Sequence, residues 1–424
     1  MFNFKVNNLY IYILMLSLAS WEIMWGNNIN TLGMTLIILT IYLMIVCVIM
    51  SINTLKFNIK LFLIILMVLN LILISVFLVG DILSFYILFE STLIPVFIIV
   101  LLWGSRLEKL RAAYYLLFFT LSSSLLMLIS IIKLYIVSGS LKIEYLSSIN
   151  LPMNIQKWGF IGFAIAMGVK IPLIPFHIWL PQAHVEAPLV GSILLAGILL
   201  KLGGYGFIFF ILPVFPQGFY YFSPVLQTLS LIAIVYGGLT TLRQSDMKRL
   251  IAYSSVSHMG FATYALFSEI SELGVSSSFI IFIAHGLISP ALFIIVSIIY
   301  DRFGSRIIKY YKGIGLIMPL LNVITFIVIL GSIAFPISLN FIGELLIIIT
   351  ASSISIISAI IISIGGIIGL KYSFYFYERI FLGSFSSYLK NGRDLNKVEL
   401  MSLIMLITPV IILGIIPYFV INKI

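Results

Sequence analysis

The stretch "GVKIPLIPFHIWLP", Gly168 to Pro181, combines features that rarely occur together. Lys170 lies inside an apolar run, and Pro172, Pro175 and Pro181 follow it closely. Proline lacks a backbone N–H and clashes with the preceding helical turn, so a helix that reaches Lys170 must end or break there. In a soluble core this segment would leave a charge and several backbone groups unsatisfied. Its role therefore depends on the solvent that surrounds the chain.

The composition identifies that solvent as a lipid bilayer. Of the 424 residues, 62% are hydrophobic and 9% are charged, whereas globular domains are about 45–50% apolar and about 25% charged. Apolar segments of roughly 20 residues recur along the whole chain, and each is long enough for a helix to cross about 30 Å of hydrocarbon. The alternating pattern of a membrane β-barrel does not occur. We therefore predict an all-α polytopic membrane protein.

Hydropathy predicts thirteen membrane spans. They cover approximately residues 9–25, 31–50, 60–79, 81–103, 111–137, 156–180, 188–212, 222–242, 249–268, 276–300, 313–350, 352–377 and 399–419. If successive loops alternate between the two sides of the membrane, one side takes seventeen lysines and arginines and the other takes three. Positive loops mark the inner side. The N-terminus is therefore expected inside and, after an odd number of spans, the C-terminus outside.

Two of these spans are expected to be broken. The first break is predicted near residues 170–176 and the second near 336–340, where Pro336 and Asn340 interrupt the run "ILGSIAFPISLNFIGELLIIIT". Irregular backbone inside a membrane is tolerated only where protein or a water-filled cavity satisfies it. One broken helix in each half of the chain is typical of transporters built from inverted repeats.

This organisation predicts four parts of the chain. Residues 1–80 are expected to form peripheral N-terminal helices, and residues 378–424 an inner-side loop with a C-terminal helix. Between them, residues 81–212 and 222–377 are predicted to be the two antiporter-like halves.

Few ionisable residues lie within the predicted spans, and these are the candidates for function. A lysine at the centre of a membrane helix costs roughly 2.5–3.5 kcal/mol, and Lys170 and Lys201 lie far from easy access to the interface. Two carboxylates have apolar sequence neighbours, and two histidines can exchange protons near neutral pH. The predicted proton-transfer residues are Glu90, Lys170, Lys201, His258, His285 and Glu344. The alternative for each is a structural ion pair or a hydrogen-bonded core residue.

Other kinds of chemistry have no support in the sequence. It contains no Walker loop, no glycine-rich dinucleotide motif, no metal-spaced cluster and no nucleophile elbow. Cys47 is the only cysteine, which excludes a disulfide or an iron–sulfur site formed by this chain alone. His177 and His184 flank the loop after the first break, where capping or packing is the favoured role. We expect no cofactor in this chain and no nucleic-acid partner, because the short basic loops are explained by topology.

The resemblance to a known family becomes specific at "PFHIWLPQAHVEAPLVGSILLAGILLKLGGYG", Pro175 to Gly206. Together with "LFESTLIP", "RQSDMKRLIAYSSVSHMG", "IAHGLISPALF" and "NFIGELL", this block resembles chain 4 of NADH:ubiquinone oxidoreductase, respiratory complex I, in the antiporter-like subunit family. The matching blocks run from about residue 80 to residue 350.

The resemblance implies a proton-translocating subunit of the membrane arm, without a redox centre of its own. It implies that Glu90 and Lys170 are the coupling ion pair, that Lys201 is the central lysine, and that Glu344 ends the path. NADH, FMN, iron–sulfur clusters and ubiquinone would be used elsewhere in the complex. The implied partners are the other membrane-arm subunits, including the related subunits 2 and 5, and membrane lipids.

The family comparison also defines where this chain departs from the pattern. Members typically have fourteen helices, so the first helix of the family pattern is expected to be missing, in agreement with an inner-side N-terminus. The abundance of Ile, Phe, Asn and Tyr and the absence of a presequence favour a mitochondrial inner-membrane protein with its N-terminus on the matrix side. Two other functions stay open at this point, namely a subunit of a multi-chain sodium/proton antiporter and an assembly scaffold that has lost pumping.

Overall fold

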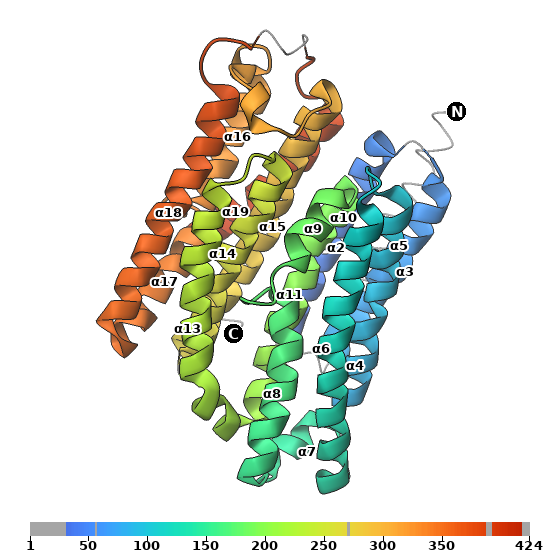
Figure 1. Ribbon diagram of the computed structural model, residues 1–424, viewed down its shortest axis with the longest axis vertical. Helices are drawn as coiled ribbons and strands as arrows, with labels where there is room; N and C mark the ends of the chain where they lie inside the picture. Colours follow the sequence, from blue (N-terminus) through green and yellow to red (C-terminus); the bar gives the residue numbers. More distant parts are fainter. Residues whose placement is uncertain (1–30, 56, 269–271, 387–391, 418–424) are drawn as a thin grey trace.

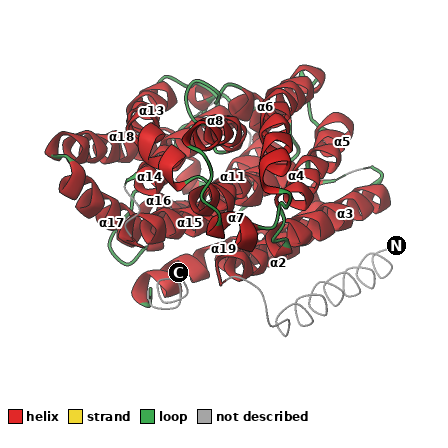
Figure 2. Ribbon diagram, turned by 90° about the horizontal axis from the view of Figure 1, so that it is seen from below, coloured by secondary structure: helices red, strands yellow, loops and turns green. Residues whose placement is uncertain are grey.

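The computed structural model describes residues 31–55, 57–268, 272–386 and 392–417, and these residues are mainly helical (Figures 1 and 2). The first part of the chain forms α2 (Thr31–Thr54), α3 (Ile59–Leu78), α4 (Ile82–Ser91), α5 (Leu93–Trp103), α6 (Lys109–Ser138), α7 (Ile143–Ser148), α8 (Met153–Lys170) and α9 (Trp179–Glu186). The next helix consists of α10 (Leu189–Leu194), η1 (Leu195–Leu199), α11 (Leu200–Gly206), η2 (Phe207–Ile211) and α12 (Leu212–Val214), where η1 and η2 are π-helical. The second part forms α13 (Pro216–Leu242), α14 (Met247–Phe267), α15 (Glu272–Phe303), α16 (Pro319–Ser332), α17 (Leu339–Ile354), α18 (Ile356–Phe381) and α19 (Lys397–Ile415).

The prediction of an all-α polytopic membrane protein is confirmed. Nine helices in the described residues are long and apolar enough to cross a membrane. Three further expected spans correspond to α8 with α9, to α14, and to α16 with α17. The remaining expected span, 9–25, lies outside the described residues.

The first predicted break is present. α8 ends at Lys170, and residues 171–178 form turns before α9 begins. The indole N–H of Trp179 donates to the carbonyl of Val169 over 3.0 Å, which ties the start of α9 to the last turn of α8. Pro181 lies in the first turn of α9, where proline is tolerated. The break is therefore made by the prolines that directly follow Lys170.

The second break lies earlier than predicted. α16 ends at Ser332 and α17 begins at Leu339, so the break covers residues 333–338. The expectation that Asn340 interrupts the helix is wrong, because this residue lies in the first turn of α17. Its side-chain amide donates to the carbonyl of Gly331 over 3.0 Å. It therefore satisfies a carbonyl that the interrupted helix would leave free.

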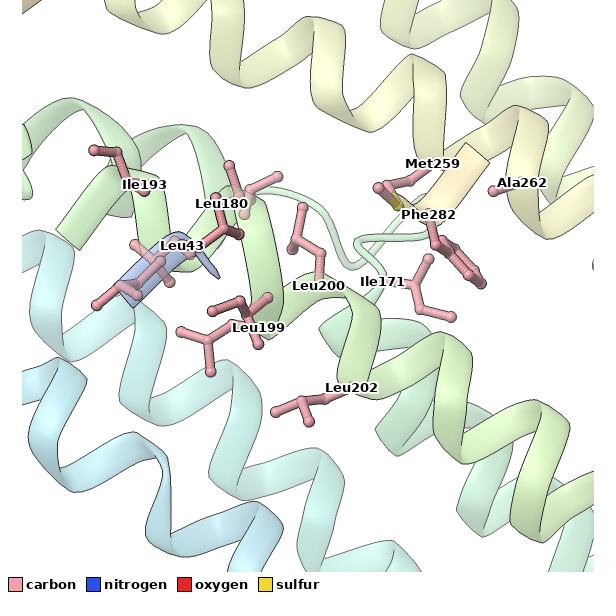
Figure 3. Packing of buried hydrophobic residues seen from close by; sticks show 14 of the residues in the cluster. Leu43, Ile171, Leu180, Ile193, Leu199, Leu200, Leu202, Met259, Ala262 and Phe282 are labelled. Carbon is pink, nitrogen blue, oxygen red and sulfur yellow. The ribbon is translucent and has the colours of Figure 1, made fainter. Parts of the chain in front are cut away.

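The helices lie in two groups that meet along the centre of the molecule. Figure 1 shows α2 to α11 on one side and α13 to α19 on the other, with their long helices roughly aligned. The interior consists of α15 and the α10–α12 helix. In their most apolar stretches of 18 residues, 100% and 94% of the residues are buried, respectively. Figure 3 shows apolar side chains packed around this interior, with Leu199 near Leu43 of α2 on one side and Ile171 of the first break near Phe282 of α15 on the other.

A glycine sets the close packing of α11 against the first break. A Cβ atom at Gly203 would lie 2.6 Å from Cγ1 of Ile171 and 2.8 Å from the carbonyl oxygen of Met167. Real Cβ atoms essentially never approach a neighbour so closely. The missing side chain therefore allows α11 to contact the end of α8 next to Lys170.

We predict that Gly203→Ala destabilises the protein by about 1–3 kcal/mol, as overpacking of a filled core usually does. The variant should give less assembled protein in native gels and a lower unfolding temperature in detergent. Gly366→Ala is the matched control, because no atom lies within 4 Å of a Cβ placed at that helical glycine. Equal stability of the two variants would contradict the close packing described here.

Candidate functional site

Lys201 and His285 form the centre of the site. Lys201 has no exposed surface, and its ammonium nitrogen lies 3.0 Å from Nδ1 of His285. The same nitrogen donates to the carbonyl of Ala196 in η1. Two of the six residues predicted for proton transfer are therefore in direct contact.

The glycine next to His285 allows this contact. A Cβ at Gly286, next to His285, would lie 3.1 Å from the carbonyl oxygen of Gly197 and 3.4 Å from Cε of Lys201. Gly197 belongs to η1, a π-helical turn of the kind often found at functional sites. α15 and η1 can thus approach closely enough for the lysine of one helix to reach the histidine of the other.

His258 continues the line of ionisable groups away from Lys201. Its ring centroid lies 6.0 Å from that of His285. Nδ1 of His258 lies 3.9 Å from Oε1 of Glu344 in α17, and Nε2 lies 3.2 Å from the hydroxyl of Tyr372 in α18. Four of the six predicted residues therefore form one continuous series, which begins in α11 and ends in α17. In order, they are Lys201, His285, His258 and Glu344.

A small cavity lies beside the two histidines. Its volume is about 30 Å³, and its lining includes Ser289, Asn340 and Tyr372. Nε2 of His285 and Oγ of Ser289 are buried without a hydrogen-bond partner among the described residues. A cavity of this size with polar partners can hold one or two water molecules. The histidines can therefore be joined through water.

Glu90 and Lys170 lie together in the first half of the chain. Lys170 is 3% exposed, and its nitrogen sits 4.4 Å from the centre of the Phe89 ring, in cation–π geometry. The two charged groups interact electrostatically, but no direct ion pair joins them in the described part of the chain. Oε1 of Glu90 is buried and has no hydrogen-bond partner among the residues that the structure describes. The coupling ion pair implied by the family resemblance therefore stays a prediction. The two groups lie close enough to interact electrostatically, but among the described residues they form no direct ion pair.

The sequence analysis missed three residues that the structure adds to the site. Tyr372 contacts His258, Phe89 covers the Lys170 ammonium, and Ser124 of α6 interacts with Glu90. None of them carries a charge, and each comes from a helix face that looks apolar in sequence. Only helix packing could identify them.

His184 and His177 have packing contacts, in agreement with the sequence prediction. The His184 ring stacks on Phe293 with ring centroids 4.7 Å apart. His177 makes edge contacts with the rings of Tyr236 and Tyr253. Among the described residues, no group of three or more His, Cys, Asp or Glu side chains has the arrangement of a metal site.

Comparisons with known proteins identify the family and the fold of this chain. The family model "NADH:quinone oxidoreductase/Mrp antiporter, TM" matches residues 79–369. One solved structure with a similar fold is respiratory complex I from Thermus thermophilus with bound NADH, with a TM-score of 0.87 and 26% identity over 94% of this chain and 84% of that chain. The Mrp complex from Dietzia sp. DQ12-45-1b also gives a TM-score of 0.87, over 99% of this chain and 91% of that chain, but at 16% identity this likeness concerns the fold alone.

Two curated relatives are much more similar in sequence. NADH-ubiquinone oxidoreductase chain 4 of Metridium senile is 45% identical over 94% of this chain and 82% of the relative. The chain 4 protein of Chondrus crispus is 43% identical over 94% of this chain and 81% of the relative. The chain therefore belongs to the NADH-ubiquinone oxidoreductase chain 4 family.

Proposed function

We propose that this chain is a proton-translocating membrane-arm subunit of respiratory complex I, in which electron transfer from NADH to ubiquinone elsewhere drives proton movement through this chain. The observation that carries the proposal is the 3.0 Å contact between Lys201 and His285 at the buried centre of the fold. Membership in the chain 4 family supports the same function.

The series of ionisable groups has the spacing that proton transfer needs. A proton passes between groups within hydrogen-bonding distance or through one water molecule. Lys201 and His285 meet the first condition, and the cavity beside His285 and His258 provides the second. Glu344 ends the series, with Oε1 3.9 Å from Nδ1 of His258, so this last transfer needs a small movement of the two side chains. We infer that one proton at a time moves along this line.

Glu90 and Lys170 are proposed to control the path. Two unit charges about 7 Å apart interact by about 2.4 kcal/mol at an effective dielectric constant of ~20. Moving one charge against ~150 mV costs about 3.5 kcal/mol, a comparable amount. Opening or closing this pair therefore changes the free energy of the Lys170 charge enough to influence pumping. The open arrangement of the two groups and the contact of α11 with the end of α8 support this role.

The two broken helices support a division of the chain into related halves. We infer that residues 81–212 and 222–377 form two antiporter-like halves, with residues 1–80 and 378–424 outside them. The chain 4 relatives favour a location in the mitochondrial inner membrane, and the basic loops favour a matrix-side N-terminus. Subunits 2 and 5 and membrane lipids are the proposed neighbours, with no nucleic-acid partner. Redox cofactors are proposed to lie in other subunits only.

A sodium/proton antiporter subunit is the alternative with the same fold. The Mrp complex chain is 16% identical to this chain, so that likeness concerns the fold alone. The chain 4 relatives, in contrast, reach 45% identity over most of the chain. The sequence similarity therefore favours the complex I function.

Lys201→Met tests the relay directly. It removes the central proton carrier while keeping an unbranched side chain of similar length, so we expect normal assembly and fewer protons pumped per electron in reconstituted vesicles. Lys371→Met is the control, because this lysine also lies within a long helix, α18, but is exposed. An unchanged proton-to-electron ratio in Lys201→Met would exclude the relay.

Tyr372→Phe tests the position of His258. Loss of the hydroxyl removes a hydrogen bond worth about 1 kcal/mol, which corresponds to roughly fivefold slower coupled turnover if that bond orients the imidazole in the transition state. Tyr375→Phe, three residues away in α18, should have little effect, since its hydroxyl has no comparable bond to a histidine in the described structure. Coupled turnover is measured as NADH oxidation by the assembled complex. Equal rates in the two variants would show that Tyr372 is a packing residue.

A further inference from the structure

A groove on the outside of the molecule lies between α6 and α8, away from the proposed relay. Its volume is about 460 Å³, within the range of about 300–1,000 Å³ that ligand pockets occupy. All of its lining residues come from these two helices. Some of them are strongly exposed, Trp158 by 66% and Ile129 by 53%. The groove therefore opens on a face that this chain does not cover.

The floor of the groove is a close contact between the two helices. A Cβ at Gly162 of α8 would lie 2.8 Å from the carbonyl oxygen of Leu126 in α6. The hydroxyl of Ser130 donates to the same carbonyl over 3.1 Å, so this short side chain stays against its own helix. Because Gly162 and Ser130 are small, the surface is hollow where the two helices meet.

Lys133 and Trp158 line the groove at one depth in the membrane. Lys133 lies five residues before the end of α6, and Trp158 lies five residues after the first residue of α8. At a rise of 1.5 Å per residue, both are about 8 Å inside these helix ends. Figure 1 shows the two ends side by side with α7 between them. Since tryptophan and snorkelling lysine mark the headgroup level of a membrane, the mouth of the groove lies at that level.

Below its mouth the groove is apolar for the depth of one leaflet. Leu126 and Ile165 also line it, and each lies twelve residues from the same helix ends, which is about 18 Å along the helix axis. One leaflet is half of the roughly 30 Å hydrocarbon core. A helix of a neighbouring subunit would cross the whole core and contact a surface of that length. The groove therefore fits an acyl chain better than a partner helix.

Positive charge gathers at the mouth of the groove. Lys133 is exposed and belongs to none of the ion pairs in the described part of the chain. Lys142 and Lys157, two of the three basic residues on the side opposite the basic loops, lie at the start of α7 and in α8. The acidic residues Glu144 of α7 and Asp81, which bridges to Lys142, do not line the groove. A phosphate group matches this charge.

We propose that the groove between α6 and α8 binds one anionic phospholipid from the leaflet opposite the basic loops. Its phosphate lies against the ammonium of Lys133, and one acyl chain lies along Leu126 and Ile165. Asn154, which lines the mouth, has amide N–H groups that can donate to the phosphate or ester oxygens. Trp158 covers the glycerol region between headgroup and chain. The site is separate from the proton relay and does not depend on the proposed function.

The test uses the assembled complex in phosphatidylcholine nanodiscs that contain a trace of a photoreactive lipid with a diazirine in its acyl chain. After irradiation, mass spectrometry identifies the labelled residues of α6 and α8. We expect a phosphatidylglycerol probe to label the groove about fivefold more than a phosphatidylcholine probe, the preference that one lysine typically adds at a membrane surface. Lys133→Met keeps most of the side-chain length without the charge and should bring this ratio close to one.

Lys157→Met is the matched control. This lysine lies at the same end of α8, but its ammonium sits 3.7 Å from the centre of the Tyr221 ring and does not line the groove. The variant should keep the fivefold ratio. Ile129→Trp tests the apolar part separately, because a larger side chain at this exposed position fills the groove and should lower labelling by both probes.

Four outcomes would overturn the site. Equal labelling by the two probes in the unmodified complex would show ordinary surrounding lipid. An equal loss of the ratio in Lys133→Met and Lys157→Met would show an attraction of the whole face, and unchanged labelling in Ile129→Trp would place the lipid outside the groove. A cross-link from a photoreactive amino acid in place of Trp158 to another subunit, without lipid labelling, would show a protein interface. Because none of these readouts measures proton pumping, failure of the site and failure of the proposed function are distinguishable.

Discussion

A fully buried lysine inside a membrane protein must have partners for its ammonium group, and the architecture around Lys201 follows from this requirement. The partners come from the π-helical turn that precedes it and from His285 on the most buried helix. That contact depends on Gly286, because a side chain there would meet the carbonyl oxygen of Gly197 at 3.1 Å and Cε of Lys201 at 3.4 Å. The lysine–histidine contact therefore lies where α15 and η1 approach each other closely.

The two breaks solve one physical problem in different ways. Both interrupt a helix at membrane depth, where each free carbonyl or N–H must find a partner within the protein. At the first break the Trp179 indole bonds to the last turn of α8. At the second, Asn340 reaches back to the last turn of α16. In each case the second half-helix supplies the group that closes the first, so both breaks can persist while an ionisable side chain remains beside them.

Arg306 and Lys248, at the inner-side loops and helix ends, have a different role from the charged residues at the centre. Arg306 and Lys248 hold backbone carbonyls and fix the end of α9 against α14 and the loop after α5. Neither oxygen of Glu186 has a hydrogen-bond partner in the described part of the chain, although these cations lie near it and a surface pocket borders the residue. A carboxylate held near cations but not bonded to them can exchange a proton without breaking an ion pair. The same separation of charges occurs at Glu90 and Lys170.

The sequence by itself determined the class of protein, the positions of the spans and the ionisable residues worth testing. These properties are local, since hydropathy, proline positions and rare charges are read from neighbouring residues along the chain. It also placed the first break correctly. Tertiary structure decided which of these residues meet, because the contact between Lys201 and His285 joins helices far apart in sequence and depends on Gly286, which carries no chemical signal. It reassigned Asn340 from a helix breaker to a hydrogen-bond donor, and it revealed Tyr372 and the groove beside Lys133 through neighbours that only folding brings together.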